Sequence, residues 1–119
     1  MSLVAHHLET SGLSTVVIGS ARDIVEEAGV PRFLFVDFPL GNPIGKPDDV
    51  EMQQSVVDLA LELAANAIAA RTTVQAPQRW GSDDWRANYM RVDESNLEAL
   101  KAAGESRRQQ QDSFRQAAT

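Results

Sequence analysis

Two short runs of the chain are apolar at almost every position, and both end at a residue that breaks regular structure. The run at 15–18 reads Thr-Val-Val-Ile and stops at Gly19, and the run at 33–38 reads Phe-Leu-Phe-Val-Asp-Phe and stops at Pro39. A strand with one face in water alternates apolar with polar residues, whereas a parallel strand covered by helices on both faces does not. The two runs therefore predict buried parallel strands.

Helices are expected before, between and after these strands. Leu3, Val4 and Leu8 have helical spacing ahead of Gly12, and Ile24, Val25 and Ala28 mark a helix that stops at Gly29. The order predicts one right-handed βαβ unit with a helix before it. Residues 39–47 hold three prolines and two glycines and are expected to form a loop, after which Asp48 caps a long helix that ends near Ala70.

The last third of the chain has a different character. We divide the chain into a partial α/β domain, residues 1–70, and an irregular arm with a C-terminal helix for subunit association, residues 71–119. A helix is expected over 94–103, followed by a tail at 107–118. The arm carries Trp80 and Trp85. We expect these side chains to wrap onto a partner, because large aromatic groups on an irregular polar segment are typical of an interface. The alternative is that they fold back onto the core of their own domain.

Two strands are too few to satisfy the backbone of a buried parallel sheet, and their unpaired edges would aggregate. We therefore expect an α/β fold with a partial parallel sheet, of Rossmann- or flavodoxin-like type, that a partner chain completes. The long helix and the C-terminal arm belong to the same expected architecture.

Composition excludes several classes of protein. The 119 residues contain no cysteine, and the formal net charge is −6, with five acidic and no basic residues between 48 and 70. Nucleic-acid binding requires clustered Lys and Arg, so no nucleic-acid partner is expected. An apolar run of roughly 20 residues, which a membrane span needs, is absent, as is a signal peptide, so we expect a cytoplasmic protein without a membrane.

The loops that follow the two strands are the candidate binding site, because ligands of open parallel sheets bind beyond the carboxyl ends of the strands. A small-molecule substrate is expected there, with Arg22 or a helix N-terminus holding an anionic group. The alternatives are that Ser20 only caps a helix, that Arg22 pairs with a nearby acid, and that the second loop is only a rigid crossover. The predicted substrate-binding residues are Gly19, Ser20, Arg22, Asp23, Pro39, Leu40, Gly41 and Asn42.

Three further titratable residues are weaker candidates. His6 and His7 are adjacent on a predicted helix and point about 100° apart, so they are a poor pair of metal ligands. Asp37 lies within an apolar run, where an acid needs a partner or a function. No metal site is predicted. The sequence has no dinucleotide fingerprint and no P-loop, and no cofactor is identified.

The string Gly-Leu-Ser-Thr-Val-Val-Ile at 12–18, followed by Ile24, Gly29, Arg32 and Pro-Leu-Gly-Asn-Pro at 39–43, resembles the C-terminal part of the B-component family of glycine, sarcosine, betaine and D-proline reductases, the selenoprotein B-like family. The resemblance covers roughly residues 1–70. Members of that family are thiol- or selenol-dependent reductases whose catalytic Cys or selenocysteine lies upstream of this region.

This resemblance implies a split enzyme. A larger or complementary subunit would carry the redox Cys or selenocysteine, and this chain would contribute one pocket wall as the small subunit of a hetero-oligomeric reductase-like enzyme. The substrate would be a small amino-acid-like or carboxylated compound, and the chain would not be active alone. The alternative is a non-catalytic scaffold or regulatory subunit that completes and stabilises the fold of its partner.

Overall fold

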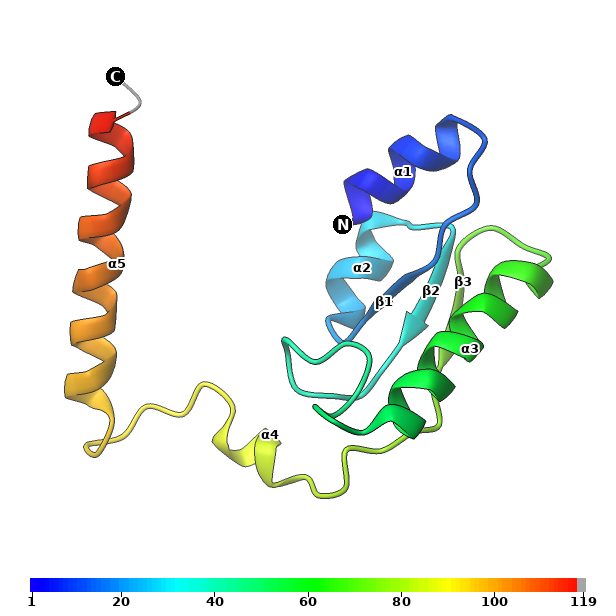
Figure 1. Cartoon of the computed structure of the whole chain (residues 1–119). Helices are drawn as coiled ribbons and strands as arrows, with labels where there is room; N and C mark the ends of the chain where they lie inside the picture. The colour runs from blue at the N-terminus through cyan, green and yellow to red at the C-terminus, as the bar shows by residue number, and fades with distance from the viewer. Residues whose placement is uncertain (118–119) are drawn as a thin grey trace. The chain divides into compact units, whose positions relative to one another are not determined.

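The computed structural model describes residues 1–117 and contains five helices and three strands in that range (Figure 1). The chain divides into two compact units, Met1–Arg86 and the residues from Ala87 onward. In chain order the elements are α1 (Ser2–Thr10), β1 (Val17–Gly19), α2 (Arg22–Ala28), β2 (Arg32–Phe35), α3 (Val50–Asn66), β3 (Thr72–Gln75), α4 (Asp84–Asn88) and α5 (Leu97–Ala117).

The three strands form one parallel sheet in the order β1-β2-β3. The expected α/β class and parallel pairing are therefore confirmed, but the expectation of only two strands is wrong. The third strand, Thr72-Thr73-Val74-Gln75, lies at the edge of the sheet and leaves its last two residues exposed. Such a strand lacks the continuous apolar pattern of a buried one, which is why it was missed.

Helices cover both faces of the sheet (Figure 1). Phe33 packs with residues of α1 and α2 on one face, and its neighbour Leu34 packs against α3 on the other. Both connections, β1-α2-β2 and β2-α3-β3, move one strand in the same direction across the sheet. Their helices lie on opposite faces, so the two crossovers have opposite hands. Right-handed crossovers are the strong rule in parallel sheets, so one of these two connections is an exception to it.

The main core lies between β2 and α3. Leu34, Val36 and Phe38 point to the same face and meet Val56 and Leu63 of α3, and each of these five side chains is buried. Burying one such side chain contributes about 1.5–3 kcal/mol. The core therefore fixes the stretch after β2, including Asp37, against the rest of the unit.

The loop at 39–49 is held against the first turns of α3. The side-chain amide of Gln53 donates to the carbonyl of Lys46 at 2.7 Å. Asp49, not the expected Asp48, is the N-cap of α3, and its carboxylate accepts a hydrogen bond from the Met52 N–H at 3.0 Å. The helix ends at Asn66, earlier than expected, and the chain turns through Arg71 at φ 58° into β3.

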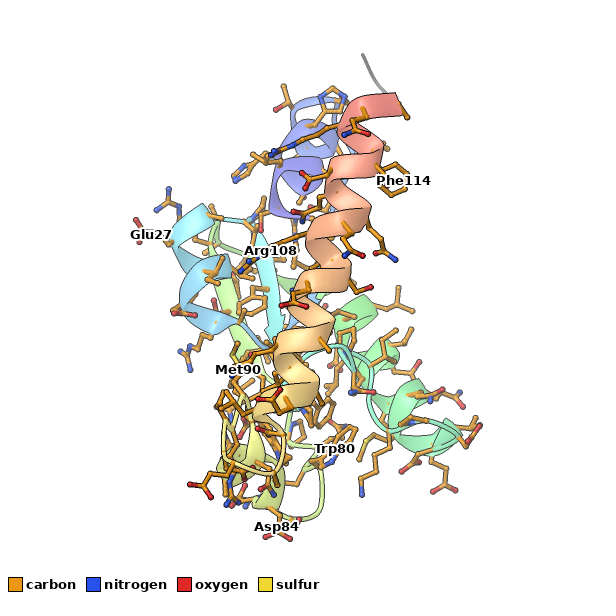
Figure 2. All side chains as sticks on the ribbon, turned by 90° about the vertical axis from the view of Figure 1, so that its left-hand side faces the viewer. Glu27, Trp80, Asp84, Met90, Arg108 and Phe114 are labelled. Atoms are coloured by element: carbon orange, nitrogen blue, oxygen red, sulfur yellow. The ribbon has the colours of Figure 1, made fainter. Side chains whose placement is uncertain are left out.

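In the second unit, the expected helix and tail form one helix, α5, which runs to Ala117 with no buried residue. The last two residues of the expected tail, 118–119, lie outside the described residues. Acids recur every seven positions at 98, 105 and 112, each three residues before a base at 101, 108 and 115. Glu98 and Lys101 form such an ion pair at 3.3 Å, and pairs of this kind stabilise an exposed helix. Phe114 projects from this helix into solvent (Figure 2).

No helix among residues 1–117 is long and apolar enough to cross a membrane.

Candidate functional site

A cavity of about 530 Å³ lies in the first unit beyond the carboxyl ends of β2 and β3. This is the edge where open parallel sheets bind their ligands. One wall comes from Asp37, two residues after β2, and the rest from the segment that follows β3. The lining residues are Asp37, Gln75, Ala76, Pro77, Gln78, Arg79, Trp80, Gly81, Ser82, Asp83, Trp85 and Arg86.

Arg86 is the centre of the charged side of this cavity. Its guanidinium donates to the Asp37 carboxylate and, through Nε, to Asp83 Oδ1 at 3.1 Å, and it stacks on the Trp85 ring with Cζ 4.6 Å from the centroid. The hydrogen bond to Asp37, followed by that to Asp83, raises the pKa of Arg86 above its ordinary value. Asp37, which the sequence marked as an acid that needs a partner, thus has one.

Another part of the lining is built around Trp80. Its ring lies 5.8 Å from the ring of Phe38, and Lys46 Nζ lies 5.6 Å from its centroid. Trp80 therefore folds back onto the core of its own unit, which corresponds to the alternative and not to the expected contact with a partner. Gln78 Oε1 is buried without a hydrogen-bond partner among the described residues, so one acceptor in the lining is unsatisfied.

The first predicted segment, Gly19 to Asp23, follows β1. The Gly19 carbonyl accepts a hydrogen bond from the Val36 N–H at 3.0 Å, so it belongs to the sheet ladder. The N-cap of α2 is Ala21, and no side chain caps this helix, so Ser20 does not cap it. Arg22 pairs with Glu26 at 3.1 Å and stacks on Phe35 at 5.5 Å, while Asp23 is exposed in the first turn.

The second predicted segment, Pro39 to Asn42, follows β2 as a tight turn. The Asn42 N–H donates to the Pro39 carbonyl at 3.2 Å, and Gly41 has a φ of 93°, which only glycine adopts without strain. Leu40 is exposed at the tip. None of the predicted residues from either segment lines the 530 Å³ cavity. Their role in binding stays a prediction.

The residues that carried the family resemblance have clear structural roles. Gly12 and Gly29 adopt φ 86° and 68° after α1 and α2. Thr15 and Arg32 both donate to the carboxylate of Glu9 at the end of α1. Thr15 and Arg32 therefore hold α1 on the sheet, and the two glycines allow the chain to leave α1 and α2.

The two histidines differ in their surroundings. His6 Nε2 lies 2.7 Å from the Ala28 carbonyl and donates a hydrogen bond to it, which joins α1 to the end of α2. His7 is exposed. Among residues 1–117, no three His, Asp or Glu side chains lie close enough together to hold a metal ion.

Sequence reasoning missed the cavity because it missed β3. Without that strand, residues 76–86 seemed to be an irregular arm rather than the loop that follows a third parallel strand. The Thr-Thr-Val run at 72–74 is the signal that could have revealed it, since these are residues that favour strands.

A second, apolar groove of about 400 Å³ follows the outer edge of β1. Its walls are α1 on one side and Pro43 and Ile44 on the other, with residues 15–18 between them. Because the Gly19 carbonyl points toward β2 and backbone direction alternates along a strand, the N–H and C=O of Ile18 point into this groove. In the described sheet β1 pairs only with β2, so this edge is open.

Comparison with known proteins gives one informative similarity. D-proline reductase subunit gamma of Acetoanaerobium sticklandii is 27% identical over 78 residues, which is 66% of this chain and 32% of the relative. The chain thus matches about a third of the length of that protein. No family model matches the chain, and no solved structure matches it. The similarity supports a relationship to the reductase family.

Proposed function

We propose that this chain is the small subunit of a hetero-oligomeric, thiol-dependent, reductase-like enzyme. The observation that carries the proposal is the similarity to D-proline reductase subunit gamma, a protein named as one subunit of a reductase. The 119 residues contain no cysteine, so under this proposal a partner subunit contributes the catalytic Cys or selenocysteine. The chain contributes a wall of the substrate pocket.

The charges of the cavity support an amino-acid-like or carboxylated substrate. Asp37 and Asp83 both pair with Arg86 in the lining, and Arg79 adds a second guanidinium. A guanidinium binds a carboxylate through two hydrogen bonds, and a carboxylate pairs with an ammonium group. A small zwitterion therefore finds partners for both of its charges. The predicted segments 19–23 and 39–42 would line the pocket only where the partner subunit extends it.

The open edge of β1 supports a partner that completes the sheet. Apolar walls flank this edge on both sides, and the outward backbone groups of Ile18 need hydrogen-bond partners. An added strand from the partner subunit would satisfy them and remove an edge that otherwise promotes aggregation.

Native purification tests the proposal. The chain should co-purify with a second protein that contains a reactive Cys or selenocysteine. The purified pair should consume a small amino acid when a dithiol is supplied as reductant, and mass spectrometry measures that consumption. Arg79→Ala and Arg22→Ala should lower turnover while the assembly stays intact, and Ser55→Ala on the exposed face of α3 is the control. If these variants abolish assembly and the partner subunit keeps its turnover, the scaffold function is supported instead. A stable, active monomer would refute both.

A further inference from the structure

Two carboxylates of the 530 Å³ cavity share one guanidinium. Arg86 Nη2 donates to Asp37 Oδ2, and Arg86 Nε donates to Asp83 Oδ1 at 3.1 Å. Because the two acids carry two negative charges and Arg86 carries one positive charge, this group of three residues is negative overall. A negative wall of a cavity favours a ligand that brings a positive charge to it.

Two acceptor atoms in the same lining have no donor. Asp37 Oδ1, the second oxygen of that carboxylate, accepts no hydrogen bond from any residue between 1 and 117. Gln78 Oε1 is buried and also lacks a partner in that part of the chain. Polar atoms that are withdrawn from water are normally hydrogen-bonded, and leaving one unsatisfied costs free energy. The cavity therefore suits a ligand that supplies N–H or O–H donors.

Asp37 is placed more firmly than Asp83. Its chain neighbours Val36 and Phe38 are both buried in the core against α3, so the backbone that carries Asp37 is fixed by packing. The Asp37 side chain is 39% exposed, whereas that of Asp83 is 85% exposed. An ionic hydrogen bond is stronger where water is partly excluded. Of the two acids, Asp37 is therefore the better acceptor for a ligand.

The tryptophans of the lining indicate which kind of ammonium group fits. Lys46 Nζ lies 5.6 Å from the centroid of the Trp80 ring, and Arg86 Cζ lies 4.6 Å from that of Trp85. Quaternary ammonium groups, which have no N–H, are recognised by aromatic faces that surround them. Here each ring already holds a cation of the protein. A ligand cation is therefore recognised through its N–H groups.

We propose that Asp37 Oδ1 accepts a hydrogen bond from a primary or secondary ammonium group of the substrate. Arg79, which lines the cavity and pairs with no residue between 1 and 117, is the partner of the substrate carboxylate. This inference rests on the proposed function, because it assigns the cavity to the substrate. It narrows the substrate class, since quaternary ammonium compounds and carboxylic acids without an amine are excluded.

A ligand series on the natively purified assembly tests the proposal without any substitution. Isothermal titration calorimetry measures the binding of racemic alanine, valine, proline, glutamate and phenylalanine. Each is compared with its fully N-methylated form and with the carboxylic acid that lacks the nitrogen. At least one amino acid should bind, and its two analogues should bind at least tenfold more weakly. Equal binding of the methylated form, or no binding by any amino acid of the panel, would overturn the proposal.

A pair of variants locates the ammonium group. Asp37→Asn keeps the size of the side chain and an oxygen for Arg86, but it removes the charge. It should weaken amino-acid binding at least tenfold and remove the preference over the methylated form. Asp83→Asn takes the other acid from Arg86 and should weaken binding less than threefold. Equal losses in the two variants, or parental binding by Asp37→Asn, would contradict the role of Asp37. If Asp37→Asn fails to assemble, the ligand series still decides.

Turnover separates this inference from the proposed function. Amino-acid binding that depends on Asp37, without any consumption of the amino acid, contradicts the reductase function and leaves the binding role of Asp37 intact. Consumption by Asp37→Asn with an unchanged KM contradicts the role of Asp37 and leaves the reductase function intact.

Discussion

The carboxylate of Glu9 accepts a hydrogen bond from Arg32 Nη1 at 2.7 Å, across 23 positions of sequence. The same oxygen accepts from the backbone N–H of Thr15 at 2.6 Å and from its hydroxyl at 3.0 Å. One acidic side chain thus joins the last turn of α1, the entry to β1 and the first residue of β2. These contacts hold α1 in place as a wall of the groove beside β1.

The Glu9 contacts make the stability of the protein depend on pH. The hydrogen bond from the Thr15 backbone is the main cause that lowers the pKa of Glu9 below its ordinary value of 4.5, and the Thr15 hydroxyl and Arg32 add to it. Because the folded pKa is the lower one, this contribution is complete above the unfolded pKa and disappears as the pH falls through the folded pKa. Glu9→Gln should lower the Tm at neutral pH and flatten its decline between about pH 5 and pH 3. Parallel Tm curves for the two proteins would contradict this role.

Gly45 should not tolerate a side chain. A Cβ at this position would lie 2.8 Å from both Cγ and Sδ of Met52, and the residue has a φ of 129°. Gly45→Ala should therefore destabilise the protein by about 2–4 kcal/mol, from backbone strain and overpacking together. Gly41→Ala is the matched control, because its φ is 93° but no atom lies within 4 Å of the added Cβ. Urea unfolding should show the smaller loss for Gly41→Ala, and equal losses would mean that Met52 moves freely.

Truncation of Leu34 should destabilise the protein far more than truncation of Leu3. Leu34 lies on the central strand β2 and is fully buried against α3, whereas Leu3 is 85% exposed on α1. Leu34→Ala should cost about 2–5 kcal/mol in the free energy of unfolding. Leu3→Ala should stay within about 0.5 kcal/mol of the parent protein. Chemical denaturation followed by circular dichroism measures both, and a small effect of Leu34→Ala would place the core elsewhere.

The adjacent histidines should differ in their effect on stability. His6→Ala removes the hydrogen bond to the Ala28 carbonyl, which should cost about 0.5–1.5 kcal/mol, with the lower end expected at an exposed site. His7→Ala should be neutral, because that side chain is exposed. Differential scanning fluorimetry of the two variants measures this difference in Tm. Equal Tm values would mean that the hydrogen bond of His6 does not stabilise the fold. Loss of turnover in His6→Ala with an unchanged Tm would instead give His6 a role in the chemistry.

Patterns that act over a few residues were predictable from the sequence. The stop at Gly29 corresponds to the end of α2, and the apolar run at 33–38 overlaps β2, which covers Arg32–Phe35 and ends three residues before the run does. Boundaries that depend on packing were less accurate. Both Asp48 and Asp49 are suitable caps by residue type, but Asp48 has a φ of 62° and Asp49 accepts the capping hydrogen bond from Met52. The cavity lies beyond the carboxyl ends of the strands, the edge that was also considered from the sequence, but of the candidate titratable and loop residues only Asp37 lines it. The binding roles of residues 19–23 and 39–42 stay a prediction.

By itself, the sequence determined that the chain alternates helices with parallel strands, because apolar runs, glycine stops and prolines act locally on the backbone. Only the tertiary structure decided that Thr72–Gln75 joins the sheet, that α2 and α3 lie on opposite faces, and that Arg86 meets Asp37 across 49 positions of sequence. The physical reason is that an edge strand and a long-range ion pair gain their stability from partners far along the chain. No local pattern records such partners, and the cavity depends on both.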